Sequence, residues 1–139
     1  MIVGERILEV SGNKDPSTPI KGLNINISLE DVKMGEKNKD NLEITYQYTA
    51  NYRDNVGEIK IKGVLIAKED AKRSKDIVDT WKKDKKVPDD YASMVLSAVN
   101  YSGSANGTLL ARVLNLTAPL IPPKIQLAKP AAGAAPKKK

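Results

Sequence analysis

The sequence between residues 41 and 66, NLEITYQYTANYRDNVGEIKIKGVLI, holds two alternating runs on either side of a turn. In the first run, apolar or aromatic side chains occupy every second position from Leu42 to Tyr52. In the second run, isoleucines alternate with charged residues. Alternation at period two is typical of a strand with one buried face. The stretch therefore predicts two antiparallel strands, at about 41–52 and 57–67.

The alternation of the second run breaks at Gly63, after which Val64, Leu65 and Ile66 are all apolar. A glycine inside a strand, followed by a change of phase, indicates a bulge or a close backbone approach. Alternatively, the end of this strand is buried on both faces. Burial on both faces would mean helices on one side and another subunit on the other.

Two further strands are expected before this pair. A short apolar run predicts a strand at about 6–11, and the Gly/Pro-rich segment 12–19 that follows has the composition of a loop. Four aliphatic residues then alternate with polar ones, which predicts a strand at about 20–33. The sheet is therefore expected to have four strands, all before the first helix.

Helical patterns fill the second half of the chain. Ile77, Val78 and Trp81 form one stripe of a helix expected at about 69–84, and the other side of this helix is charged. A second amphipathic helix is predicted at about 88–101, because Pro88 suits the first turn of a helix. Trp81 is expected to anchor the core.

The sequence Tyr101-Ser102-Gly103-Ser104 predicts an interruption of this second helix. A third helix is expected at about 106–115. Beyond it, prolines at positions 119, 122 and 123 require an extended segment over about 119–127. Strands followed by helices predict an α+β domain over residues 1–127, with an antiparallel four-stranded sheet and two or three helices on one face.

The composition excludes the commonest catalytic residue types. The 139 residues include no cysteine and no histidine, which leaves no thiol nucleophile, histidine base or usual zinc site. Carboxylates at Glu43, Glu58, Asp54 and Asp89 could form an acid/base pair, but strand and turn residues of this kind are usually solvated. We therefore expect no enzyme, with no catalytic residue, no metal and no cofactor.

The net charge of +6 comes largely from the last twelve residues. Residues 128–139 are rich in Ala, Pro and Lys and are expected to form a flexible tail, because they cannot bury enough apolar surface to offset their ordering entropy. The tail contains four lysines and no acid, so residues 1–127 carry only 6 − 4 = +2. The tail lysines are Lys129, Lys137, Lys138 and Lys139.

A second basic cluster surrounds the end of the first predicted helix, at Lys82, Lys83, Lys85 and Lys86. Cations at this position complement the helix dipole, and solvated lysines are the usual case. Together with the tail, the cluster could instead contact the phosphates of RNA. No aromatic-interleaved RNA motif accompanies it, so such binding would depend steeply on salt and only weakly on sequence.

Four features together resemble a known family. They are the long strand 41–52, the sequence 55–63 (NVGEIKIKG), the sequence 81–88 (WKKDKKVP) and the Pro-rich end of the domain. Over about residues 6–127 the layout is similar to a group of small archaeal proteins related to SecB, the export chaperone. The resemblance implies a four-stranded antiparallel sheet with helices on one face. It also implies homo-oligomers, dimers or tetramers, that hold unfolded polypeptides in apolar grooves without nucleotide or metal.

Candidate binding residues lie on the first strand of the opening pair. Tyr46, Tyr48 and Tyr52, together with Ile121 in the Pro-rich segment, are expected to line a polypeptide-binding groove or a subunit interface. Aromatic rings give large contact area at low entropic cost, although strand aromatics usually pack in a core. The chain lacks the acidic surface by which bacterial SecB is thought to meet its translocase, which puts export targeting in doubt.

Two functions from different classes follow. The first is a cytoplasmic, SecB-like binding protein whose partners are unfolded or nascent polypeptides. The alternative is a ribosome-associated or RNA-binding protein that uses the same scaffold for docking and its lysines for RNA contact. No apolar run approaches the length needed to cross a bilayer, so no membrane insertion is expected.

Overall fold

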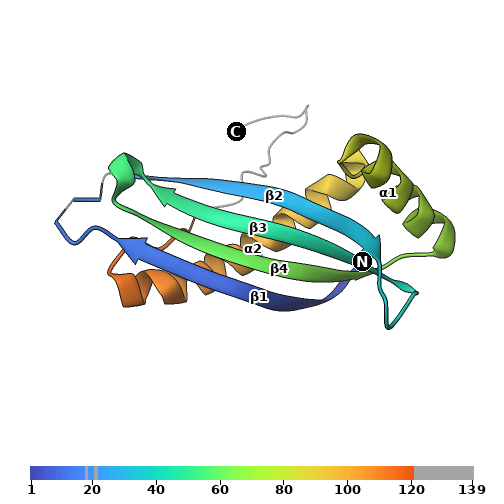
Figure 1. Ribbon diagram of the computed structural model, residues 1–139, viewed down its shortest axis with the longest axis horizontal. Helices are drawn as coiled ribbons and strands as arrows, with labels where there is room; N and C mark the ends of the chain where they lie inside the picture. The colour runs from blue at the N-terminus through green and yellow to red at the C-terminus, as the bar shows by residue number, and fades with distance from the viewer. Residues whose placement is uncertain (18, 21, 121–139) are drawn as a thin grey trace, which may run out of the picture.

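The computed structural model describes residues 1–17, 19–20 and 22–120, and within them a single antiparallel sheet backed by helices (Figure 1). The strands are β1 (Ile2–Lys14), β2 (Leu23–Met34), β3 (Asn41–Tyr52) and β4 (Gly57–Lys68). Their order in the sheet is β1-β4-β3-β2. A one-turn 3₁₀ helix, η1 (Arg53–Asn55), joins β3 to β4. The helices are α1 (Ala71–Asp84) and α2 (Asp89–Leu114). The predicted fold class is confirmed.

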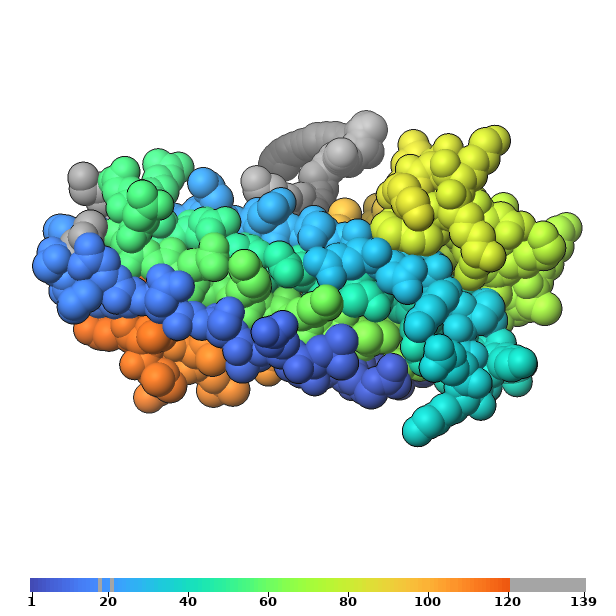
Figure 2. Space-filling model, in the orientation of Figure 1, coloured from blue at the N-terminus to red at the C-terminus, as the bar shows by residue number. Residues whose placement is uncertain are grey.

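The two faces of the sheet differ because each strand alternates. Leu42, Ile44, Tyr46, Tyr48 and Ala50 of β3 are buried on the face that α2 covers, and their β4 partners include Ile59, Ile61 and Leu65. The other face carries mostly polar side chains. Asn24 of β2, for example, lies opposite Asn51 of β3, and Ser28 lies opposite Gln47. Figure 2 shows this second face, which lies on the side of the sheet opposite α2.

β1 is longer than predicted, extending over 2–14 instead of 6–11. Its ends contain glycine and polar residues, which carry no alternating apolar signal. Backbone pairing with β4 nevertheless continues from Ile2 opposite Ala67 to Lys14 opposite Gly57. Because backbone hydrogen bonds do not depend on side-chain type, the strand continues into residues whose side chains show no alternation.

Gly63 is a site of close backbone approach, as its position inside a strand predicted. A Cβ at this position would lie 2.6 Å from the hydroxyl of Tyr46 and 3.0 Å from the carbonyl oxygen of Arg6. The register between β1 and β4 also shifts between Ile7 and Glu9, opposite Gly63 and Lys62. The bulge therefore belongs to β1, and the glycine of β4 makes room for the tyrosine.

The end of β4 is covered on its open face by an ion pair from the neighbouring strands. Val64 lies on that face opposite Arg6 of β1, yet it is buried. Arg6 pairs with Glu43 of β3 at 3.6 Å, so the pair passes over β4, which lies between those strands. The covering of Val64 thus comes from this chain, where the sequence had raised the alternative of a second subunit.

The predicted interruption at 101–104 is wrong, because α2 is one continuous helix of 26 residues. Gly103 and Gly107 are both buried where α2 crosses the sheet. A Cβ at Gly103 would overlap the ring of Tyr48, and one at Gly107 would lie 2.8 Å from Pro119. The glycines permit close packing of the helix and do not break it.

Replacing Gly103 by alanine is expected to lower the free energy of unfolding by about 1–3 kcal/mol, because the added methyl group overpacks the contact with Tyr48. A glycine that only loosened the helix would give the opposite sign, since alanine gains up to about 1 kcal/mol of helix propensity. Urea unfolding followed by circular dichroism measures the difference. Ser97→Ala, at an exposed position of α2, is the control and should change stability little.

Candidate functional site

The predicted tyrosines lie inside the protein. Tyr46 and Tyr48 are fully buried and Tyr52 is 2% exposed, all beneath the helical layer. They belong to the hydrophobic core with Val95 and Val99 of α2. In this chain they therefore have no surface to offer a polypeptide, and their burial corresponds to the core alternative. Ile121 lies outside the described residues.

The hydroxyl groups of these tyrosines have different environments. Tyr46 donates to Glu5 of β1, and Ser102 of α2 donates to the same carboxylate at 2.7 and 2.8 Å, which ties the edge strand to the helix. Tyr52 donates to the carbonyl oxygen of Thr117. The hydroxyl of Tyr48 is buried without a hydrogen bond of good geometry among the described residues, although the Ser104 hydroxyl of α2 is close enough to act against the rise in its pKa that burial causes.

The burial of the tyrosines changes their acidity. Burial and the neighbouring Glu5 carboxylate raise the pKa of Tyr46 above its ordinary value. Burial also raises the pKa of Tyr52 to about 12, with a further contribution from Tyr48. The buried phenols therefore stay neutral at neutral pH.

The four carboxylates considered for catalysis lie on separate elements. Glu43 pairs with Arg6 at 3.6 Å, and Glu58 pairs with Lys60 at 3.7 Å. Asp54 lies in η1, and Asp89 begins α2. Within residues 1–17, 19–20 and 22–120, no group of three or more acidic side chains could hold a metal ion.

The basic cluster at the end of α1 is solvated, with Lys82, Lys83, Lys85 and Lys86 all exposed. Lys85 ends the helix in a left-handed conformation, and its ammonium lies 5.8 Å from the centre of the Trp81 ring. Trp81 itself is buried, as predicted. The tail lysines at positions 129 and 137–139 lie outside the described residues, so RNA contact stays a prediction.

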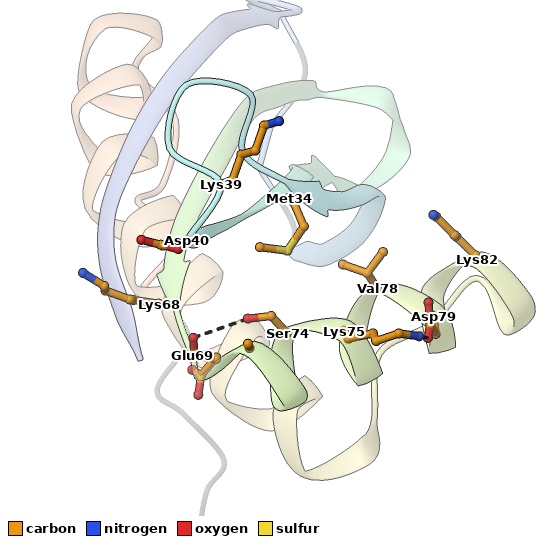
Figure 3. Close-up of a pocket in the computed structure, with 11 residues that line it drawn as sticks. Met34, Lys39, Asp40, Lys68, Glu69, Ser74, Lys75, Val78, Asp79 and Lys82 are labelled. Carbon is orange, nitrogen blue, oxygen red and sulfur yellow. Dashed lines mark hydrogen bonds and ion pairs between the residues drawn. The ribbon is translucent and has the colours of Figure 1, made fainter.

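A cavity of about 480 Å³ opens between α1 and the end of the sheet (Figure 3). Met34, the last residue of β2, faces Val78 of α1 across it, with Ala71 at the start of the helix. Ser74 is buried beneath and donates to the carbonyl oxygen of Glu69 at 3.4 Å. The cavity therefore has an apolar floor. Its charged wall is formed by Lys39, Asp40, Lys68, Glu69, Lys75, Asp79 and Lys82.

The position of α1 beside this cavity is set by contacts at its first turn. Asp70 caps the helix by accepting from the backbone N–H of Arg73 at 2.7 Å. The side chain of Arg73 then pairs with Asp90 of α2 at 2.7 Å and lies over the ring of Tyr91 at 5.6 Å. The Arg73 guanidinium lowers the pKa of the Asp90 carboxyl. These contacts hold α1 against α2 and leave its Val78 side facing the cavity.

A second apolar surface lies on the outer side of α2. Tyr101 and Val113 are 80% and 83% exposed, and Leu96 and Leu109 are exposed on the same helix. No charged residue occurs between positions 91 and 111. The edge strand β1 adds further exposed apolar side chains, at Val3, Ile7, Leu8 and Val10.

Sequence reasoning missed both surfaces. The charge-free run 91–111 was a usable signal for the outer side of α2, since a helix that faces water normally carries charges there. No local pattern in the sequence predicts the cavity, because its floor combines the last residue of β2 with residues of α1. Met34 and Val78 are separated by 43 intervening residues, so only the fold brings them together.

The structure is similar to the Mycobacterium tuberculosis Rv1957 SecB-like chaperone, solved in complex with a ChAD peptide from the Rv1956 HigA1 antitoxin. The TM-score is 0.59 at 12% sequence identity, and the match covers 94% of this chain and 92% of that chain. The chain has a SecB-like fold. The archaeal part of the resemblance stays a prediction.

No protein-family model matches the sequence, and no curated protein matches it. At 12% identity the structural likeness describes the fold and leaves the activity open. None of the helices in the described part of the chain is long and apolar enough to span a membrane.

The different environments of the tyrosine hydroxyls lead to a test of their role in packing. Tyr52→Phe is expected to lower the free energy of unfolding by about 1 kcal/mol, because it removes the hydrogen bond to Thr117. Tyr48→Phe keeps the ring and removes a buried hydroxyl that makes no hydrogen bond of good geometry among the described residues, so stability should stay unchanged or rise. Equilibrium urea unfolding compares the two. Equal losses for both variants would contradict this assignment.

Proposed function

We propose that this chain is a non-enzymatic, SecB-like binding protein that shelters apolar segments of unfolded or nascent polypeptides. The observation that carries the proposal is the open cavity between α1 and the sheet. Its floor is apolar at Met34, Ala71 and Val78, and its volume suits one large apolar side chain with its neighbours. The similar chaperone was solved with a bound peptide, which supports the same class of ligand here.

This assignment places client binding away from the buried tyrosines. An extended client would lay one apolar side chain onto the floor between Met34 and Val78 while its backbone stays near the charged wall. Such binding needs no nucleotide and no metal. It also needs no rearrangement of the core, because the cavity is open in the folded chain (Figure 3).

The proposal predicts that the protein suppresses the aggregation of a urea-denatured client enzyme after dilution, as measured by light scattering. Ala71→Trp should reduce this effect several-fold, because Ala71 is exposed and lines the cavity, so an indole there fills it. Asn51→Trp is the matched control, since Asn51 is exposed at the end of β3 and does not line the cavity. A wild-type protein without effect on aggregation would refute the proposal.

We further propose that the chain forms dimers or tetramers through the outer side of α2 and the edge of β1. Exposed apolar residues on a helix without charges between positions 91 and 111 are unfavourable in water and typical of a helix buried on both sides. An edge strand of 13 residues with free backbone groups offers a second surface for pairing.

The variant Leu109→Glu/Val113→Glu is expected to be monomeric, with a mass near 15.2 kDa by light scattering after size exclusion, because it places two charges in the proposed interface. The wild type should elute as a dimer or tetramer. Lys83→Glu/Lys86→Glu, at exposed positions outside that surface, should keep the wild-type mass. A wild type that is monomeric at micromolar concentration would contradict the proposed interface.

A further inference from the structure

The charges around the α1 cavity are not balanced. Four lysines and three acidic residues line it. Lys75 pairs with Asp79 at 2.7 Å, and the amino group of Met1 pairs with Glu69. The groups left without an ion pair in the described part of the chain are Lys39, Lys68, Lys82 and Asp40. The wall therefore keeps an excess of 3 − 1 = +2.

The unpaired lysines surround the floor from three elements. Lys39 lies in the turn between β2 and β3, Lys68 ends β4, and Lys82 lies near the end of α1. All three are exposed, and each carries its ammonium on a flexible stem, so the groups of Lys39 and Lys68, which Figure 3 draws turned away from Met34 and Val78, can turn toward a ligand seated there. Within this wall the acidic side chains of Asp79 and Glu69 are already engaged, which leaves three lysines and Asp40 to meet the ligand.

We propose that this cavity selects polypeptide segments in which a large apolar side chain is flanked by acidic residues. The inference rests on the proposed polypeptide binding and names the class of segment that binds. The apolar side chain would bury itself between Met34 and Val78, and its acidic neighbours would meet Lys39, Lys68 and Lys82. Charge complementarity at such a rim sets which partner binds more than it sets the total affinity.

The same geometry predicts weaker binding of basic segments. Lysine or arginine beside the apolar anchor would approach the three unpaired ammonium groups and would find Asp40 as the one unpaired acid of the wall among the described residues. Like charges brought together at a rim disfavour the wrong partner, and the effect weakens as salt screens it.

Fluorescence anisotropy with labelled peptides tests the inference on the full chain. The probes are a short peptide with leucine between two pairs of glutamates, the same peptide with lysines, and the acidic peptide with glycine for leucine. At about 50 mM salt, the acidic leucine peptide should bind about tenfold more tightly than the lysine peptide. The glycine peptide should bind at least tenfold more weakly than its leucine counterpart.

Variants assign the preference to the cavity wall. Lys39→Glu/Lys68→Glu/Lys82→Glu should abolish or reverse the preference for the acidic peptide. Lys72→Glu/Lys83→Glu/Lys86→Glu changes the net charge equally at exposed positions that do not line the cavity, and it should keep the preference. Ala71→Trp should weaken binding of the acidic leucine peptide.

The outcomes separate this inference from the proposed function. Equal binding of acidic and basic leucine peptides, both weakened by Ala71→Trp, would overturn the charge selection and leave polypeptide binding intact. Absence of binding to every peptide, with no suppression of aggregation, would overturn both. A short single-stranded RNA is included as a further probe. If the RNA bound through the three wall lysines and the acidic peptide did not displace it, the peptide selection would be overturned in favour of phosphate binding.

Discussion

The contact between α2 and the tyrosines of β3 is the interaction on which the rest of the structure depends. Gly103 and Gly107 bring the helix backbone onto the ring of Tyr48 and onto Pro119, and no side chain larger than hydrogen fits there. The close approach lets α2 cover the buried row of β3 and β4 with one helix. It also fixes the line along which α2 crosses the sheet (Figure 1), and with it the position of α1.

Polar contacts then hold the packed strands and helices in place. Glu5 links the edge strand to the helix through Tyr46 and Ser102, and Arg73 links the two helices through Asp90. On the opposite face, Arg6 and Glu43 pass over β4. Near Gly63 the sheet therefore contacts a helix on one face and carries an ion pair on the other.

The sequence allowed the strands to be predicted well where one face is buried, because alternation at period two is then imposed on the side chains. The predicted strand at 41–52 coincides with β3. Prediction failed at Gly103, since a glycine that permits close packing and a glycine that ends a helix look the same in one dimension. The cavity could not be predicted at all, because Met34, Ala71 and Val78 become neighbours only through the fold.

The order of the strands has a consequence for synthesis on the ribosome. β2, β3 and β4 pair with their neighbours in sequence, so they can form as soon as each is made. β1 is made first, yet it pairs with β4, with Ile2 opposite Ala67. Until β4 has left the ribosome, β1 exposes its apolar side chains and its unpaired backbone groups, and such segments are prone to aggregate. During its own synthesis, the chain thus passes through the state that a holding chaperone protects.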